Sequence, residues 1–238
     1  EVREAMRARV DSPTRLFCGH AGTPAFELLA WVAEASDTDL EDEGLLAAAE
    51  AMGALYFAVR CQDDIVDVAA NPLWTYLGQG FFDRALTLLV EASGSAEEMV
   101  LAWTDIQRNF LEAATVDAQL RVDPAARWDR EAIQLQGRKF LPILVPLVAV
   151  LMRGGRRHDT EAVTATVECL GVALQLTNDL NGAFADLEAC LGSPFLSHMG
   201  IRAGVHSSAE LARAICSAAD SGKLSSYRGT IEAALHSC

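Results

Sequence analysis

The chain has 238 residues, of which 51% are hydrophobic, and its formal net charge at pH 7 is −14. This length is enough to bury a sizeable core, and we expect one domain over residues 1–238. The acidic balance argues against a nucleic-acid surface or an anionic-membrane surface, because both need a basic patch and the sequence shows none.

The start of the chain predicts helices and an acidic loop. Two helices are expected over residues 1–36, with joints near Asp11-Ser12-Pro13 and near His20 to Pro24, because Asp or Ser followed by Pro is typical of a helix start. Residues 36–43 carry several acidic side chains and predict a loop, and Gly44 precedes the next helix. We expect that helix to end at a cluster of aspartates.

The aspartate cluster contains Asp63, Asp64 and Asp67. At ~100° per residue, Asp63 and Asp67 share one helical face, which Tyr56 and Val59 continue as an apolar stripe. Like charges this close repel one another, so the cluster destabilises a helix unless a cation binds to it. Oxygen ligands of this kind suit Mg²⁺, which completes its shell with water and with substrate phosphate oxygens. A solvated helix face is the alternative in a chain with 33 acidic residues.

Two apolar helices are expected after this cluster. One runs from Trp74 to Ala92 and is broken by Gly94, and the next runs from Ala96 to Val122. The second of these helices carries Trp103 and Phe110. Plain core packing is the alternative to a role for these two aromatic side chains in a binding pocket.

A further helix is expected from Trp128 to Met152, and Pro142 and Pro146 should kink it. Lys139 lies where the apolar part of this helix begins. A lone lysine is commonly a solvated side chain, but its entry into an apolar helix favours a role in binding phosphate.

The helix expected from Thr160 to Glu188 repeats the pattern of the aspartate helix. Its small and apolar residues, followed by oxygen-bearing ones, drift slowly round one face: Gly171, Gln175, Asn178, Gly182 and Asp186. Two helices that each carry such a stripe can face one another and enclose an apolar pocket, with a metal and diphosphate site at its rim.

The rest of the chain carries fewer signals. Residues 207–236 predict two short helices split near Ser221 and Gly222, with Tyr227 and Arg228 as an exposed pair rather than a cap over a bound diphosphate. The six cysteines lack CxxC spacing, which argues against a zinc site and indicates reduced thiols in a cytoplasmic protein. The longest apolar run, Phe140 to Met152, is too short and too interrupted by proline for a transmembrane helix.

Two motifs resemble those of a known superfamily. Asp63-Asp64-Ile65-Val66-Asp67 resembles the DDxxD motif of trans-isoprenyl diphosphate synthases and class I terpene synthases. Gly171-x-x-x-Gln175-x-x-Asn178-Asp179 resembles the helix that carries their second metal site, and the likeness runs from about Leu45 to Asp186. It implies an all-α isoprenoid synthase fold, a single helical bundle around a central apolar cavity, with Mg²⁺ as cofactor and a homodimer as the assembly.

The second motif is closer to that of terpene cyclases than to that of chain-elongating synthases. Elongating synthases repeat DDxxD here, whereas this chain has Asn178 followed by Gly182 and Asp186 at intervals of four residues. Gly182 offers no hydroxyl, so a water would replace that ligand, and Asp186 is shorter than the glutamate usual there. The metal-ligating positions that the resemblance implies are Asp63, Asp67, Asn178, Gly182 and Asp186.

The resemblance also implies one contact to the substrate diphosphate and the loss of the site that binds the diphosphate of isopentenyl diphosphate. Lys139 corresponds to the lysine of the Lys-Thr element, which contacts the substrate diphosphate, and Gln119 resembles the glutamine of the Gly-Gln motif. The cationic elements that hold isopentenyl diphosphate are replaced by residues 68–74 and 192–195, which contain no Lys or Arg. The implied substrate-binding residues are Tyr56, Phe57, Val59, Trp103, Phe110, Gln119, Lys139 and Gln175.

These features predict a terpene cyclase that ionises a linear C15 or C20 prenyl diphosphate and releases diphosphate. The residues expected to carry the chemistry are Asp63, Asp64, Asp67, Asn178 and Lys139. Prenyl transfer to another acceptor, chain elongation with isopentenyl diphosphate, and a non-catalytic partner subunit are the alternatives. Ala58 and Val59, just before the first motif, are small, and in the superfamily that the motifs resemble, bulk at this place shortens the pocket. The resemblance therefore implies a C15 or C20 substrate, and Ala58→Phe is expected to favour shorter ones.

Overall fold

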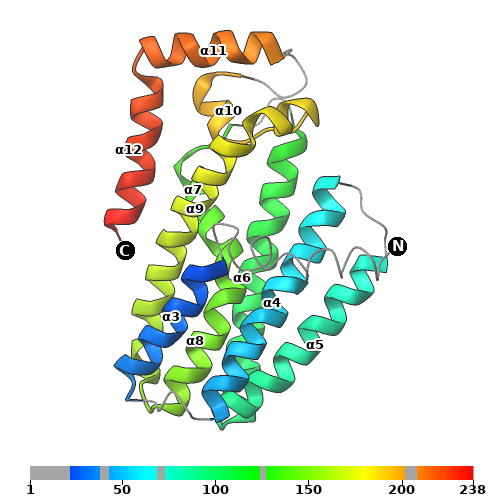
Figure 1. Cartoon of the computed structure of the whole chain (residues 1–238), viewed down its shortest axis with the longest axis vertical. Helices are drawn as coiled ribbons and strands as arrows, with labels where there is room; N and C mark the ends of the chain where they lie inside the picture. The colour runs from blue at the N-terminus through cyan, green and yellow to red at the C-terminus, as the bar shows by residue number, and fades with distance from the viewer. Residues whose placement is uncertain (1–21, 38–42, 69–72, 124–126, 202–207, 238) are drawn as a thin grey trace. The chain divides into compact units, whose positions relative to one another are not determined.

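The computed structural model describes residues 22–37, 43–68, 73–123, 127–201 and 208–237, without the side chains of residues 22–26, 63–68, 208 and 211. Every regular element among these residues is a helix, which confirms the all-α class (Figure 1). The chain forms two compact units, one from residues 1–107 and 142–163 and the other from residues 108–141 and 164–238. One domain over residues 1–238 stays a prediction.

The first unit is built mainly from long helices. Its central helix is α4, and α5 lies along it (Figure 1). The other helical segments of this unit are α3, the first part of α6, most of α8, η2 and the first turn of α9. The bounds are α3 Gly22–Ala35, α4 Glu43–Val68, α5 Leu73–Ser93, α6 Ala96–Val122, α8 Leu141–Arg153, η2 Arg157–Asp159 and α9 Thr160–Glu188.

A glycine allows α4 and α5 to approach closely. A Cβ atom added at Gly78 would lie 3.3 Å from the Cβ atom of Cys61 and 3.4 Å from the carbonyl oxygen of Ala58. Ala58 and Cys61 have no exposed surface. The part of α4 just before the aspartate cluster is therefore packed tightly against a neighbouring helix.

This packing changes the expected effect of Ala58→Phe. A phenyl group at a position with no exposed surface has to displace its neighbours, so we expect the substitution to lower the free energy of unfolding by about 3 kcal/mol. Leu46→Phe is the matched control, because Leu46 lies on the same helix and is 62% exposed. Urea denaturation of both variants measures the effect. Equal midpoints for Ala58→Phe and the unaltered chain would contradict the packing described here.

The second unit combines the rest of α6 and most of α9 with five shorter helical segments. These are α7 Arg130–Leu135, η1 Gln136–Phe140, α10 Pro194–Met199, α11 Ser208–Asp220 and α12 Lys223–His236. The predicted bounds of the long helices from Ala96 to Val122 and from Thr160 to Glu188 are confirmed, and so is the division of the C-terminal region near Ser221 and Gly222. The short helix α10 was not predicted.

The predicted helix from Trp128 to Met152 is divided into three segments. After α7, the five residues of η1 form a 3₁₀ helix, and α8 then begins at Leu141. Pro142 lies in the first turn of α8, where a missing N–H group costs no helical hydrogen bond, and Pro146 lies inside α8. The change of helix type therefore comes before both prolines.

A crossing of two glycines accompanies this change of helix type. A Cβ atom at Gly137 of η1 would lie 2.2 Å from the carbonyl oxygen of Glu168. One at Gly171 of α9 would lie 2.7 Å from the carbonyl oxygen of Gly137. The backbones of η1 and α9 thus touch, which fixes η1, and with it Lys139, against the helix of the second motif.

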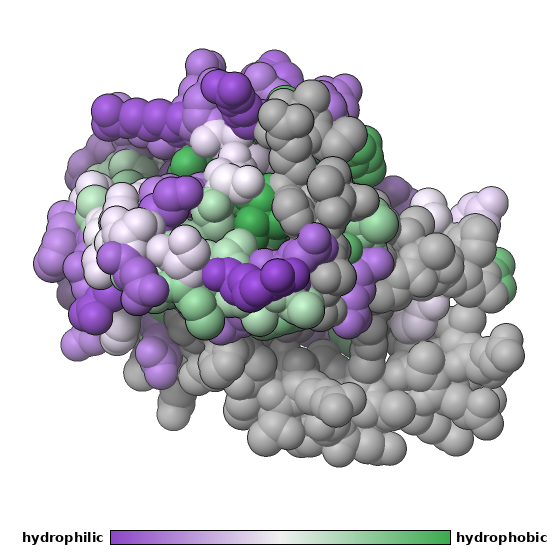
Figure 2. Space-filling view, turned by 90° about the horizontal axis from the view of Figure 1, so that it is seen from above, coloured by the Kyte–Doolittle hydropathy of each residue, from purple (hydrophilic) through white to green (hydrophobic). Residues whose placement is uncertain are grey.

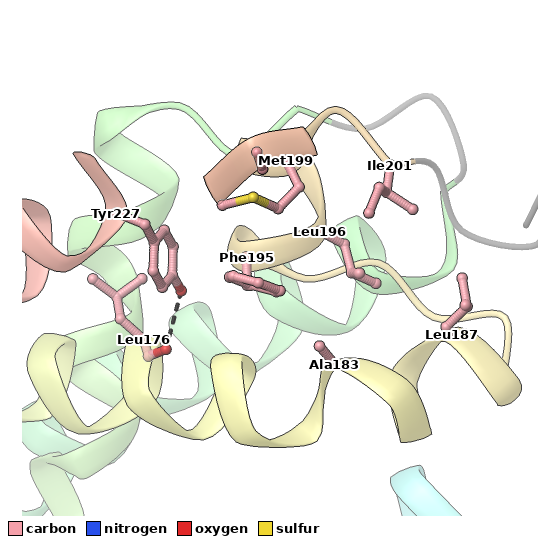
Figure 3. Close-up of a cluster of buried hydrophobic side chains, with 9 residues drawn as sticks. Leu176, Ala183, Leu187, Phe195, Leu196, Met199, Ile201 and Tyr227 are labelled. Atoms are coloured by element: carbon pink, nitrogen blue, oxygen red, sulfur yellow. Dashed lines mark hydrogen bonds between the residues drawn. The ribbon is translucent and has the colours of Figure 1, made fainter. Parts of the chain in front are cut away.

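A buried apolar cluster joins α9, α10, α11 and α12. In Figure 3, Phe195, Leu196 and Met199 of α10 lie over Leu176 and Ala183 of α9. Tyr227 of α12 donates a hydrogen bond of 3.0 Å to the carbonyl oxygen of Leu176, and its ring meets that of Phe195 edge to face with centroids 5.2 Å apart. The remaining buried members are Leu187, Ile201 and Ala218.

Tyr227 is therefore not the exposed residue that was predicted. It is 3% exposed, whereas the side chain of Arg228 is 80% exposed and pairs with Glu232 at 2.7 Å. Burial, together with the negative charge of Asp179, raises the pKa of the Tyr227 phenol above its ordinary value. The phenol therefore keeps its proton and donates its hydrogen bond to the Leu176 carbonyl oxygen.

Figure 2 looks down on the molecule from above the view of Figure 1. Hydrophilic residues cover much of the coloured surface there, with hydrophobic ones between them.

Two helical stretches are long and apolar enough to cross a membrane. They are Glu43–Gln62 and Arg130–Arg153. Of the most apolar part of each stretch, 56% is buried inside the structure in the first and 67% in the second. The core helices of a soluble protein meet the same criterion. The absence of a transmembrane segment therefore stays a prediction.

Candidate functional site

The first aspartate motif lies in the last turns of α4. The helix extends to Val68 and includes Asp63, Asp64 and Asp67, so the predicted end of this helix at the motif is confirmed. The side chains of these three aspartates lie outside the described residues. Their role as metal ligands stays a prediction.

The second motif lies beside a cluster of charged side chains, which we call the ion cluster. It consists of Asp117 and Arg121 of α6, Lys139 of η1, and Asp179 and Asp186 of α9. Lys139 Nζ lies 2.8 Å from Asp117 Oδ2. The Arg121 guanidinium lies 3.3 Å from Asp117, 3.5 Å from Asp179 and 3.4 Å from Asp186. All five side chains belong to the second unit.

The ion cluster is largely removed from solvent. The side chain of Asp179 is 1% exposed, and burial raises its pKa to about 7, although the charge of Arg121 and a hydrogen bond from Gln175 lower it. Within the described part of the chain, Asp117 Oδ1 and Asp179 Oδ2 are buried without a hydrogen-bond partner. Charged groups held in such surroundings interact more strongly than they do in water.

The residues predicted from the second motif have different surroundings. Gln175 is buried and donates a hydrogen bond of 2.9 Å from Nε2 to Asp179 Oδ1. Asp186 is partly buried in the ion cluster, whereas Asn178 is exposed. Gly182 has no atom of another segment within 4 Å of an added Cβ atom. Of the three predicted metal-ligating positions on α9, the ion cluster includes Asp186 alone.

This arrangement does not fit a divalent ion at the second motif. Mg²⁺ needs oxygen ligands that converge at about 2.0–2.1 Å from the ion. Here the carboxylates of Asp179 and Asp186 each face a different nitrogen of Arg121. Among the residues that the structure describes, no group of three or more His, Cys, Asp or Glu side chains is placed to hold a metal ion.

Three aromatic residues among the predicted substrate-binding positions are buried or contact other aromatic rings. Phe57 is 7% exposed, and its ring lies 4.8 Å from that of Phe81, between centroids. Trp103 meets Phe82 edge to face at 6.0 Å, and Phe110 is 5% exposed. The place of Trp103 and Phe110 in a binding pocket, with core packing as the alternative, stays a prediction.

The remaining predicted substrate-binding residues are divided between surface and interior. Tyr56 and Val59 of α4 are partly buried, and Gln119 of α6 is exposed. Lys139 is partly buried, and its ammonium group points at Asp117 rather than standing in solvent. A phosphate group that bound Lys139 would thus compete with a carboxylate that already holds it.

Three members of the ion cluster were not among the predicted site residues. Asp117 and Arg121 carry one local signal, since opposite charges four residues apart lie on the same side of a helix. Asp179 follows Asn178 in the second motif but lies about 100° from it round the helix. The pairing of Arg121 with Asp179 and Asp186 joins residues far apart in the sequence, and no local pattern indicates it.

Comparisons of the chain with protein-family models, with curated proteins and with solved structures found no match. The interpretation of the site therefore depends on the residues themselves, their geometry and the resemblance of the two motifs.

Proposed function

We propose that this chain is a class I terpene synthase with an isoprenoid synthase fold. In this proposal it ionises a linear C15 or C20 prenyl diphosphate in a Mg²⁺-dependent reaction, cyclises the allylic cation and releases diphosphate. We further propose that it works as a homodimer, as the resemblance of its motifs implies, and that it is a cytoplasmic protein without a transmembrane segment, as its scattered cysteines and its short, proline-interrupted apolar run indicate.

The observation that supports the proposal most directly is the ion cluster on the helix of the second motif. An all-helical unit with an apolar core gathers three carboxylates, one guanidinium and one ammonium group around Asp117 and Arg121. Burying charges is costly unless they are paired, so a cluster of this kind is commonly associated with function. The cluster includes Asp186, which is one of the second-motif positions on α9 named in the sequence analysis.

The proposed chemistry is the departure of a diphosphate anion. Mg²⁺ bound at Asp63 and Asp67 would supply Lewis-acid stabilisation of the developing negative charge. Lys139, to which the resemblance of the motifs assigns a diphosphate contact, would donate a hydrogen bond from its ammonium group to a diphosphate oxygen, exchanging Asp117 for the substrate. Arg121 would remain with Asp117 and keep that carboxylate neutralised after Lys139 has moved.

Prenyl transfer to a different acceptor and chain elongation with isopentenyl diphosphate are the alternative reactions. A non-catalytic partner subunit is the alternative of another class. Residues 68–74 and 192–195 contain no Lys or Arg to hold a second diphosphate, which favours cyclisation over elongation.

Product analysis with defined substrates tests the proposal. The purified chain is incubated with Mg²⁺ and C10, C15 or C20 prenyl diphosphates, with and without isopentenyl diphosphate, and extracts are analysed by mass spectrometry. We expect a hydrocarbon or terpene alcohol from one substrate alone. Asp63→Ala should lower its formation at least ~100-fold, because a ligand of the proposed leaving-group metal is lost.

Asp83→Ala is the matched control, because Asp83 is an exposed carboxylate on α5 and should leave turnover unchanged. Longer diphosphates that appear only with isopentenyl diphosphate would replace the cyclase proposal with chain elongation. Consumption only with another added acceptor would indicate prenyl transfer. No consumption of any substrate by a folded chain would favour the partner subunit.

A further inference from the structure

The guanidinium group of Arg121 occupies the centre of the carboxylates on the second unit. Its three nitrogens each face a different acid: Nε faces Asp117, Nη2 faces Asp179 and Nη1 faces Asp186, at 3.3–3.5 Å. A planar guanidinium presents its N–H groups as a rigid fan, which suits several carboxylates arranged around its edge.

The backbone around Arg121 is fixed as well as its side chain. The N–H group of Gly192, in the segment after α9, donates a hydrogen bond of 2.7 Å to the carbonyl oxygen of Arg121. A Cβ atom at Gly192 would lie 3.4 Å from the carbonyl oxygen of Leu120. The backbone at the end of α6 is therefore attached to the segment that follows the second-motif helix. The side chain of Arg121 is held separately by the three carboxylates.

From this geometry we infer that Arg121 is the resident cation of the second motif and excludes a divalent ion from it. The inference concerns a site of the proposed enzyme and rests on the proposed function. In this chain, a side chain supplies the positive charge that the resemblance would assign to a metal ion held by Asn178, Gly182 and Asp186. The divalent ions of the reaction are then confined to the first aspartate motif.

The permanent positive charge of Arg121 supports this inference. Asp117, Asp179 and Asp186 carry three negative charges when ionised, and Arg121 and Lys139 carry two positive charges. A guanidinium does not lose its proton in proteins, so Arg121 cannot become neutral to admit a metal ion. A divalent ion would have to displace Arg121 from its carboxylates or remain close to it, and like charges at such short distances repel strongly.

The positions of the predicted ligands agree with it. Gln175, Asp179 and Asp186 lie within about 40° of one another round α9 at ~100° per residue, and all three face the ion cluster or a member of it. Asn178 is exposed to one side of this stripe, and Gly182 has no ligand atom in its side chain. The oxygens of α9 are therefore arranged for Arg121.

Counting bound Mn²⁺ by electron paramagnetic resonance tests the inference without turnover. The background is the full chain with Asp63→Asn and Asp67→Asn, which removes the first motif. Bound Mn²⁺ is compared between this background and the same chain with Asp186→Asn added, each with and without inorganic diphosphate. Taking the difference removes Mn²⁺ that is bound elsewhere or held by diphosphate in solution.

We expect no difference between these two chains, since no ion is held at Asp186. A loss of one Mn²⁺ per chain on Asp186→Asn would overturn the inference. Adding Arg121→Gln to the background should create a site: one Mn²⁺ per chain is gained, the melting temperature rises with Mn²⁺, and Asp186→Asn abolishes both effects. Arg121→Lys, which retains the charge, should gain no Mn²⁺.

A folded Arg121→Gln chain that gains no Mn²⁺ would contradict the idea that Arg121 takes the place of a metal ion. The comparison with Asp186→Asn retains Arg121, so it decides the inference even if Arg121→Gln does not fold. Failure of the proposed function is a separate result, because a chain without turnover on any prenyl diphosphate still gives a definite Mn²⁺ count.

Discussion

Replacing Gly137 with alanine is expected to be among the most destabilising single-methyl additions in this chain. The new Cβ atom would lie 2.2 Å from the carbonyl oxygen of Glu168 and 3.0 Å from a methyl group of Val172. The first contact is with backbone, which cannot rotate away as a side chain can. We expect a loss of about 3 kcal/mol or more in the free energy of unfolding, since η1 must separate from α9.

Thermal unfolding measures this loss. For a chain of this size, 3 kcal/mol corresponds to a fall of about 6–12 °C in melting temperature. Gly182→Ala is the matched control on α9, because an added Cβ atom there meets nothing within 4 Å. Alanine is the better helix former, so this control should gain about 0.5–1 kcal/mol. Similar melting temperatures for the two variants would show that η1 and α9 do not touch at Gly137.

Tyr227→Ala is expected to release α12 from the rest of the second unit. The substitution removes a ring that is 3% exposed and packs against Phe195, and it also removes the hydrogen bond to the Leu176 carbonyl oxygen. Loss of a buried aromatic side chain costs about 3–5 kcal/mol. Hydrogen exchange should consequently accelerate in α12 and in the part of α9 near Leu176 (Figure 3).

Two neighbouring substitutions separate the causes of this effect. Tyr227→Phe keeps the ring and removes the hydroxyl, so it should cost about 1 kcal/mol, the net value of a typical hydrogen bond. Arg228→Ala alters only an exposed ion pair with Glu232 and should change stability by less than about 0.5 kcal/mol. Equal exchange rates in Tyr227→Ala and Arg228→Ala would mean that Tyr227 does not hold α12.

The helices could be predicted from the sequence where a strong local signal marks their ends. Gly94, with a φ of 71°, separates α5 from α6, and the periodic pattern of α9 continues without interruption from Thr160 to Glu188. The interruption before α8 could not be predicted in this way. It coincides with the approach of Gly137 to Glu168, which lies on another helix, so the cause is tertiary rather than local.

For the candidate site too, the sequence indicated the local pattern on one helix but not its partner from another helix. The spacing of Gln175 and Asp186 along α9 indicated a polar stripe, and both side chains interact with members of the ion cluster. The partner of that stripe, Arg121, comes from α6, 58 residues before Asp179 in the sequence. Helical periodicity indicates which residues share a face, but it does not indicate which charge from another helix will meet them.

The division of the chain has a consequence for its synthesis. The first unit takes residues 1–107 and then 142–163, and the second unit takes the segment between them and everything after them. The first unit therefore cannot be completed until residue 163 has left the ribosome, by which time the first segment of the second unit has already emerged. Neither unit can be released intact by a single cut in the chain, so expressing one of them alone requires the joining of separate segments.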